Sequence, residues 1–230
     1  MKEIMEEVSI MKQVTVDGFR AALDHICDLI VAAEPELTRI DNIVGDGDHG
    51  FGMYDGFSEL KKELATGIQF ETLRDLARYT GMVLVKSMGG ASGVIFGTLF
   101  IGGVDALTAP DGSFLTEVDA EGLRRYFRLG AEAISHRGKA KANDRTMLDA
   151  LLWAADAMES TDTEDVAELL KAGWDGACAG AEATKNMIPR LGRTKNFRDK
   201  ALGWPDPGAI STSIIFRGFY ESFSGINSNF

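Results

Sequence analysis

The segment DGFRAALDHICDLIVAA, residues 17–33, repeats its apolar side chains at the spacing of an α-helix. Side chains three and four residues apart lie on the same face of a helix. The apolar face of this segment carries Leu23, Ile26, Cys27 and Ile30. Pro35 follows, and a proline removes a backbone donor and usually marks the end of a helix. The segment therefore predicts an amphipathic helix over residues 17–33 that Pro35 closes, with a polar loop after it.

The same spacing recurs along the rest of the chain, whereas alternation of β-branched and polar residues is rare. It predicts further helices over residues 52–64, 71–86, 92–107, 120–136, 145–158, 164–189 and 208–223. Thr161 and Glu164 have the spacing of a capping box for the seventh helix. Because the connections are short, we expect an all-α fold, an eight-helix antiparallel up-and-down barrel or bundle.

The length of 230 residues suits one hydrophobic core, so we expect a single domain over residues 16–230 after an N-terminal extension over residues 1–15. The net charge of −11 argues against nucleic acid and against an anionic membrane, because both attract basic surfaces. The most apolar stretch, residues 94–104, is too short to span a bilayer, and the N-terminus lacks the charge order of a secretory signal. These features predict a cytoplasmic protein.

Cys27 and Cys178 lie far apart in apolar helical segments, without the spacing of a metal site or a redox pair. We therefore interpret both cysteines as buried free thiols.

Residues 41–50, DNIVGDGDHG, form the densest polar cluster of the chain. Asp41, Asp46 and Asp48 offer hard oxygen ligands, which suit Mg²⁺ or Ca²⁺, and the glycines between them permit sharp turns. An EF-hand loop would need glycine and glutamate at positions where this chain has phenylalanine, so that interpretation fails. Two hypotheses stay open: a magnesium site that bridges phosphates to the protein, and an Asx-rich turn that only caps the next helix.

Three more polar segments precede predicted helices. Residues 89–93, GGASG, could present backbone amides to an anion, or could serve close helix packing, and they lack the lysine of a Walker A loop. Residues 138–147, GKAKANDRTM, could be a simple helix start capped by Asp144, and residues 204–208, WPDPG, could be a simple Pro-Gly turn at Asp206. In an antiparallel bundle these loops and the aspartate loop follow alternate helices, so we expect all four at one end.

Taken in order, the segments IVGDGDHG, GGASGVIFG, GKAKANDRTMLDA and GWPDPGA resemble the L subunit, or C-terminal kinase domain, of dihydroxyacetone kinases. The resemblance covers residues 17–224 and implies an eight-helix barrel that binds ADP or ATP at one end. It implies that Asp41, Asp46 and Asp48 are catalytic and hold Mg²⁺, as two ions. It also implies nucleotide contacts at His49, Gly50, Ala91, Ser92, Gly138, Met147, Arg193, Asp206 and Gly208.

The chain departs from that family at two places. Members commonly carry asparagine where this chain has Gly52, and a Pro-Gly-Asp-Lys-Thr run where it has residues 142–146, ANDRT. The departures leave the three aspartates intact and affect the surroundings of the nucleotide and the contact with a partner.

The resemblance further implies that a separate K subunit holds dihydroxyacetone or a related short ketose, to which this chain would transfer a phosphoryl group. Two alternatives stay open. One is a relay, in which permanently bound ADP is rephosphorylated by a phosphohistidine protein of the sugar phosphotransferase system. The other is a regulatory nucleotide-binding module. The sequence also leaves a homodimer open.

The three histidines allow different interpretations. His49 could be a general base or a phosphorylated residue, because the reference pKa of histidine lies near neutrality. Its position beside Asp48 favours a nucleotide contact instead. His25 lies on an apolar helix face and His136 at a helix end, where structural roles are expected.

Overall fold

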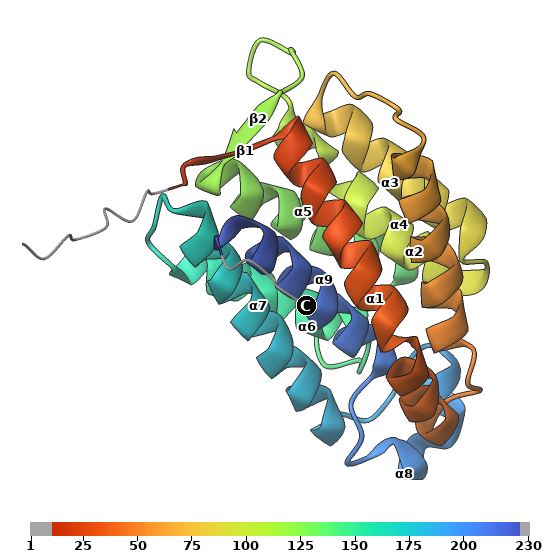
Figure 1. Cartoon of the computed structure of the whole chain (residues 1–230). Coiled ribbons are helices and arrows are strands. Elements are labelled where there is room, and N and C mark those ends of the chain that lie inside the picture. Colours follow the sequence, from red (N-terminus) through yellow and green to blue (C-terminus); the bar gives the residue numbers. More distant parts are fainter. Residues whose placement is uncertain (1–10, 226–230) are drawn as a thin grey trace, which may run out of the picture.

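Eight long helices form an antiparallel barrel in the computed structural model, which describes residues 11–225 apart from the side chains of residues 193 and 197–199 (Figure 1). They are α1 (Val16–Val44), α2 (His49–Ala65), α3 (Leu73–Ser87), α4 (Gly90–Gly102), α5 (Ala120–Gly138), α6 (Met147–Ser160), α7 (Val166–Ala183) and α9 (Pro207–Phe223). Each helix packs against the next, and α9 closes the ring between α7 and α1. The prediction of an all-α, up-and-down barrel is confirmed.

Short elements fill the connections between the long helices. They are α8 (Arg198–Ala201) and the 3₁₀ helices η1 (Val104–Leu107), η2 (Thr184–Asn186) and η3 (Arg193–Phe197). Three of them, η2, η3 and α8, lie between α7 and α9, so this is the connection with the most structure of its own.

The prediction that Pro35 closes the first helix is wrong, because α1 continues through Pro35 to Val44. A proline inside a helix costs one hydrogen bond and a steric clash, on the order of 3 kcal/mol. Tertiary packing offsets that cost here. Ile40 and Val44 are buried against Ala201 in a small apolar cluster that Trp204 also joins. The extension carries Asp41 to the end of the barrel.

Other boundaries also differ from the sequence prediction. Helix α4 stops at Gly102, and η1 covers the rest of the expected segment, while α7 stops at Ala183 before η2. The predicted capping box at Thr161 is also wrong, because the side chain of Asp165 caps α7 by accepting from Ala167 N. A capping box does occur at α6, where Thr146 is the N-cap.

A small antiparallel sheet that the sequence did not predict joins β1 (Gln13–Thr15) to β2 (Glu117–Asp119). Val14 faces Val118 across the sheet, and both valines are buried. Three residues per strand are too few to establish an alternating pattern. The boundary that we expected between the N-terminal extension and the domain, after residue 15, falls at the end of β1. Strand β1 pairs with β2 and is part of the fold. Residues 1–10 lie outside the described part of the chain, so the division into extension and domain stays a prediction.

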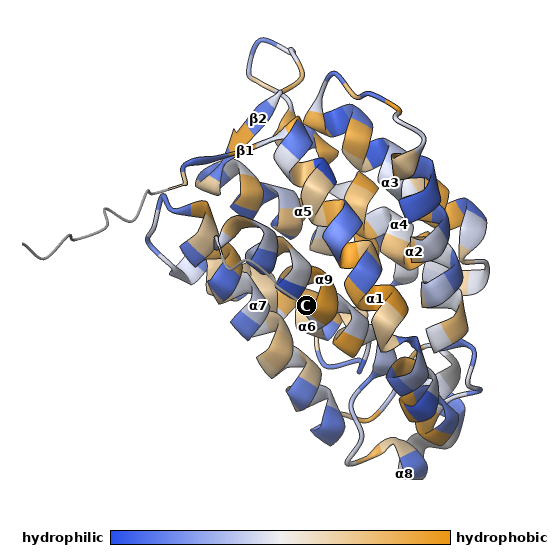
Figure 2. Ribbon diagram, in the orientation of Figure 1, coloured by the Kyte–Doolittle hydropathy of each residue, from blue (hydrophilic) through white to orange (hydrophobic). Residues whose placement is uncertain are grey.

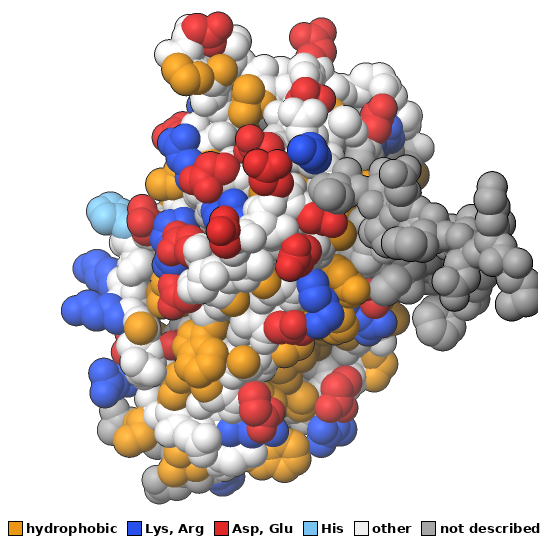
Figure 3. Space-filling view, turned by 90° about the vertical axis from the view of Figure 1, so that its left-hand side faces the viewer, with side chains coloured by type: hydrophobic (Ala, Val, Ile, Leu, Met, Phe, Trp, Pro, Cys, Tyr) orange, Lys and Arg blue, Asp and Glu red, His pale blue; other side chains and the backbone are white. Residues whose placement is uncertain are grey.

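The core of the barrel is one cluster of buried apolar side chains to which all eight long helices contribute. Phe19, Tyr126, Phe127, Phe216 and Phe219 form its aromatic centre, with ring centroids 4.6–6.1 Å apart in the contacting pairs. Hydrophobic and hydrophilic residues alternate around the visible helices in Figure 2, as amphipathic packing requires. Acidic and basic side chains are interspersed on the face drawn in Figure 3.

The apolar stretch at α4 is longer than the sequence interpretation allowed. The window Gly90–Leu107 is apolar and long enough to cross a membrane by length and composition alone, and 50% of it is buried inside the fold. Helix α4 also crosses α3 closely, since a Cβ on Gly97 would lie 2.7 Å from the Gly81 carbonyl oxygen. Core packing therefore accounts for much of this helix's apolar character.

The two cysteines differ in burial. Cys27 is buried in the core, where burial raises the pKa of its thiol. Cys178 is exposed on α7, so the interpretation of both as buried thiols is wrong for this one. The apolar pattern of α7 did not show which side of the helix faces the core.

Candidate functional site

Four connections meet at one end of the barrel and enclose a pocket. They join α1 to α2, α3 to α4, α5 to α6, and α7 to α9. Most of the side chains and glycines singled out in the sequence line this pocket: Asp41, Asp46, Asp48, His49, Ala91, Ser92, Gly138, Met147, Asp206 and Gly208. The expectation that the four polar loops share an end is therefore met. Its cause is the alternating direction of the helices.

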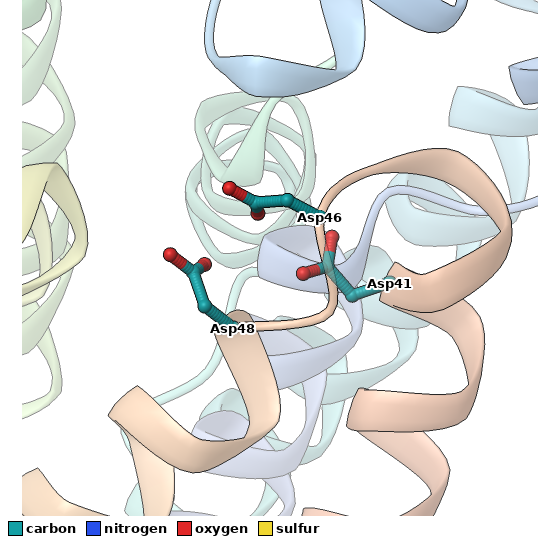
Figure 4. A group of neighbouring side chains, drawn as sticks. All are labelled: Asp41, Asp46 and Asp48. Atoms are coloured by element: carbon teal, nitrogen blue, oxygen red, sulfur yellow. The ribbon is translucent and has the colours of Figure 1, made fainter.

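Three carboxylates converge at the α1–α2 connection (Figure 4). Asp41 comes from the last turn of α1, Asp46 from the loop and Asp48 from the residue before α2, and ligand oxygens of all three lie within 4.8 Å of one another. Asp41 is buried, and one of its oxygens accepts a hydrogen bond from His49 N at 3.1 Å. This bond caps α2, whereas Asp48 makes no side-chain capping bond to α2, so capping accounts for Asp41 but not for Asp48.

The electrostatics of the cluster favour a cation. The pKa of Asp41 is raised, first by burial and then by the charges of Asp46 and Asp48, while the His49 amide partly opposes the shift. A divalent cation between the three groups would remove this repulsion. Hard carboxylate oxygens with room for water and phosphate are what Mg²⁺ prefers, so the donor set fits that ion.

His49 lies buried behind the carboxylates. Its Nε2 is 2.8 Å from Ser211 Oγ, and its ring centroid is 6.1 Å from that of Phe96. Ser211 Oγ in turn donates to Pro207 O, so the network assigns the Nε2 proton to His49. Burial lowers the pKa of His49 to about 4. A neutral, fixed ring suits a wall of the pocket better than a general base near pH 7.

The glycine pair before α4 adopts left-handed backbone angles, with φ of +66° at Gly89 and +57° at Gly90. A Cβ at either position would meet nothing within 4 Å, so the backbone angle rather than space explains the glycines. The turn presents Ala91 and Ser92, in the first turn of α4, to the pocket. No side chain caps this helix, so its first amides are available to an anion.

The α5–α6 connection holds all the non-glycine residues with positive φ in the described part of the chain: Lys139, Asn143 and Arg145. Asp149 of α6 holds the loop in place, because its carboxylate accepts from Asn143 N at 2.5 Å and from Thr146 N at 2.8 Å. Unfavourable backbone angles of this kind persist only where the surroundings impose them.

The start of α9 forms the opposite wall. Asp206 caps this helix by accepting from Ala209 N at 3.0 Å, where the sequence predicted only a turn, and its own amide donates to Thr184 Oγ1 at 2.8 Å. Burial raises the pKa of Asp206 to about 6, and the charge of Arg145 opposes that shift. Gly208 comes close to α6, where a Cβ would lie 3.1 Å from Met147 Cβ. At the other helix start, the expected cap Asp144 is replaced by Thr146.

Two of the expected nucleotide-contact residues, Gly50 and Arg193, are not among the described residues that line the pocket. Gly50 lies against α1, where a Cβ would approach Thr38 N to 2.6 Å and Glu34 O to 2.7 Å, so close helix crossing explains this glycine. Arg193 begins η3, but its side chain is outside the described part of the chain. Its neighbours Gly192 and Thr194 do line the pocket.

Sequence reasoning missed several lining residues. The apolar ones are Ile95, Phe96, Ile134, Ala140 and Leu191, and the polar ones are Arg145 and Thr146. The apolar side chains lie on helices and in loops where any core residue would look the same. Arg145 lies within the segment GKAKANDRTM, residues 138–147. Its position directly before the N-cap Thr146 and the apolar start of α6 was the available signal.

Comparison with known proteins gives a consistent family. The DAK2 domain model matches residues 43–221. The "PEP-dependent dihydroxyacetone kinase 2, ADP-binding subunit DhaL" of Listeria innocua is 32% identical over 216 residues, covering 92% of this chain and 98% of the relative. The "PEP-dependent dihydroxyacetone kinase, ADP-binding subunit DhaL" of Escherichia coli is 35% identical over 193 residues, covering 83% and 88%.

A solved structure agrees with these relatives. The dihydroxyacetone kinase from C. freundii, in complex with AMP-PNP and Mg²⁺, superposes with a TM-score of 0.69 at 26% identity. The match covers 96% of this chain but only 37% of that longer chain. Fold, motif order and sequence identity agree, and the chain belongs to the DAK2 domain family.

Proposed function

We propose that this chain is the nucleotide-binding subunit of a dihydroxyacetone-type kinase, and that it holds ADP or ATP with magnesium in the pocket described above. The observation that carries the proposal is the meeting of Asp41, Asp46 and Asp48 with Ala91 and Ser92 of the first turn of α4 in one pocket. The names of relatives that this chain matches over most of their length support the same function.

The proposed roles follow from position. Asp41, Asp46 and Asp48 would hold magnesium, as two ions, and magnesium would neutralise the phosphates and keep them in line for transfer. The amides of Ala91 and Ser92 would bind phosphate oxygens at the start of α4. Phe96 and Met147, with the other apolar lining residues, would hold the nucleoside. His49 would keep the aspartate loop and α9 in register through Ser211.

The first test is thermal unfolding with ligands. A ligand that binds only the native state at one hundred times its Kd stabilises by about 2.7 kcal/mol, or roughly 5–10 °C for a chain of this size. We expect that shift with Mg²⁺ and ADP together, and little with either alone. An equal shift from ADP in EDTA would contradict the bridging role of the aspartates.

We propose the relay as the donor mechanism, with ADP as a bound cofactor. The relatives matched over most of their length carry PEP-dependent names, whereas this chain spans only about a third of relatives such as the D-erythrulose kinase of Mycolicibacterium smegmatis. Unfolding the purified protein should release ADP at close to one molecule per chain. An empty site with rapid ATP exchange would favour an ATP-dependent subunit instead.

The acceptor site lies outside this chain in our proposal, on a ketose-binding K subunit that docks over the pocket, in the cytoplasm. We assign the described residues that line the pocket to magnesium and the nucleotide, and we assign none of them to a ketose carbonyl. The purified chain alone should therefore not phosphorylate dihydroxyacetone, and adding a K subunit and a phosphoryl donor should restore transfer. Robust activity of the isolated chain would overturn this assignment.

A further inference from the structure

Arg145 is an unusual residue for its position. Its side chain is fully buried, and arginine is among the residues least often buried without a paired charge. Its backbone φ is +60°, in the left-handed region that non-glycine residues rarely adopt. Both features cost free energy, and the protein retains both at the start of α6, beside the pocket.

The partners of the guanidinium lie in the segment that leads into α9. Nη2 donates to Trp204 O at 2.8 Å and to Ala201 O at 3.1 Å. Nη1 lies 4.0 Å from Asp206 Oδ1. Nε and Nη1 have no hydrogen-bond partner among the described residues. Arg145 therefore connects the α5–α6 loop to the α7–α9 connection, with part of its hydrogen-bonding capacity unused.

A purely structural role explains this arrangement poorly. Replacing both members of a buried ion pair by apolar side chains is often neutral or stabilising, whereas removing one member leaves the other charge uncompensated. Apolar side chains at 145 and 206 together could fill the same space without buried charges. The charge itself therefore needs a reason, and the nearest carboxylate is that of Asp206.

Asp206 both caps α9 and forms part of the pocket wall. Its Oδ2 caps α9 through Ala209 N, its Oδ1 faces Arg145, and the residue lines the pocket. The charges of Asp149 and Asp41 also act on it and raise its pKa, whereas Arg145 lowers it. Without Arg145, the wall beside the phosphates would present another uncompensated carboxylate to an anionic ligand.

We propose that Arg145 is a positioning residue for the nucleotide, which balances the charge of Asp206 and ties residues 201–206 to the start of α6. Arg145 lines the pocket, but its guanidinium is buried against residues 201–206, so we expect it to act through that wall rather than by contact with the ligand. It holds that wall in position and offsets the negative charge of Asp206, which would otherwise repel phosphates. Among the pocket-lining residues with described side chains, it is the sole lysine or arginine. This inference rests on the proposed nucleotide-binding function.

The test combines three variants and two measurements. Calorimetry gives the Kd for ADP in excess Mg²⁺, and thermal unfolding without ligand gives Tm. Arg145→Met should raise Kd at least tenfold and lower Tm. Arg145→Lys keeps the charge but not the fork that reaches two carbonyls, so Tm should fall while Kd stays within threefold. The double variant R145M/D206N should bind as well as D206N alone, because the charge that needs balancing is gone.

Arg124 provides a matched control at the other end of the barrel. Its guanidinium also donates to backbone carbonyl oxygens, those of Met158, Thr161 and Thr163, at 2.7–3.0 Å. Arg124→Met should lower Tm and leave the Kd for Mg·ADP unchanged. The control separates a general loss of stability from an effect on the pocket.

Several outcomes would overturn the inference. A wild-type Kd in R145M, or a tenfold loss in R145K, would show that charge balance at Asp206 is not the role. The R145K result decides the question if R145M does not fold. A double variant that binds tenfold more weakly than D206N would also contradict it. A wild-type chain that binds no Mg·ADP would instead refute the proposed function, and this inference with it.

Discussion

The two ends of the barrel begin their helices in different ways. At the end away from the pocket, α1, α3, α5 and α7 each start with a side chain that accepts a hydrogen bond from the first turn: Thr15, Thr72, Asp119 and Asp165. At the pocket end, the N-cap residues of α6 and α9 cap their helices in this way. The first amide of α2 donates to Asp41 of α1 instead of to its own N-cap residue, and α4 has no side-chain cap. The uncapped start is the one at the glycine turn.

The difference separates stability from binding. A helix start leaves backbone amides without partners in the helix, and a capping side chain satisfies one of them. At α4 the protein forgoes that gain where an anion could use the amides instead. The pocket end also carries the left-handed residues Lys139, Asn143 and Arg145, each at a cost of about 1–3 kcal/mol. One end of the barrel supports the fold, and the other retains groups for a ligand.

The largest expected effect comes from the supporting end. Phe19 is buried in the first turn of α1, with its ring centroid 5.3 Å from Phe219 and 6.1 Å from Tyr126. Phe19→Ala should lower the free energy of unfolding by about 3–5 kcal/mol, because it leaves a cavity that the neighbours cannot fill. Denaturant titration measures the loss. The Kd for Mg·ADP of the remaining folded protein should not change. A large change would contradict the idea that the two ends of the barrel serve stability and binding separately.

The corresponding experiment at the pocket end removes one carboxylate of the aspartate cluster. Asp48→Asn should weaken Mg·ADP binding at least a hundredfold, or about 3 kcal/mol, since magnesium loses a negative ligand. The Tm without ligand should stay within about 2 °C, because Asp48 is exposed and its side chain does not cap α2. Asp55→Asn, at an exposed carboxylate further along α2, is the control and should bind normally. Unchanged affinity in Asp48→Asn, measured by calorimetry, would remove the metal site.

Acid titration should expose two opposing buried groups at the pocket end. The pKa of His49 is lowered from 6.5 to about 4, so between these values the unfolded chain binds a proton that the folded chain does not. That contribution to stability is lost as the pH falls. The pKa of Asp206 is raised from 3.8 to about 6, so the folded chain binds the extra proton and the contribution grows as the pH falls.

The two contributions should nearly cancel in the wild type, and single variants should separate them. Asp206→Asn should lose about 2 kcal/mol more than the wild type between pH 7 and pH 4.5, from the linkage of proton binding to unfolding. His49→Gln should lose about 2 kcal/mol less over the same interval. Chemical denaturation at the two pH values measures both. Parallel pH profiles in all three proteins would contradict the two pKa shifts.

The smallest effect compares one cap from each end. Thr72 caps α3 through Asp75 N at 3.1 Å, and Thr146 caps α6 in a capping box beside the pocket. Replacing either threonine by alanine should cost about 1 kcal/mol of stability. Only Thr146→Ala should also weaken Mg·ADP binding, by a few-fold, because the loop that it holds lines the pocket. Equal binding in both variants would mean that the pocket tolerates a loosened α6 start.

Local patterns were sufficient where the deciding contacts lie within one or two turns of helix. Helical spacing located all eight long helices, and the Pro-Gly turn expected at Asp206 falls directly at the start of α9. The same reasoning failed at Pro35, where packing of Ile40 and Val44 on Ala201 keeps α1 helical. It failed at Cys178 as well, because the side of α7 that faces solvent depends on how α6 and α9 pack against it.

The sequence by itself determined the helices, the order of the four polar loops and the hard-oxygen character of Asp41, Asp46 and Asp48. These follow from periodicity, turn residues and ligand chemistry, which each act over a few neighbouring residues. Only the tertiary structure decided that the loops close around one pocket, that Gly50 serves a helix crossing, and that Arg145 is buried against residues 201–206. Those outcomes depend on contacts between residues far apart in the chain, and a single sequence does not record them.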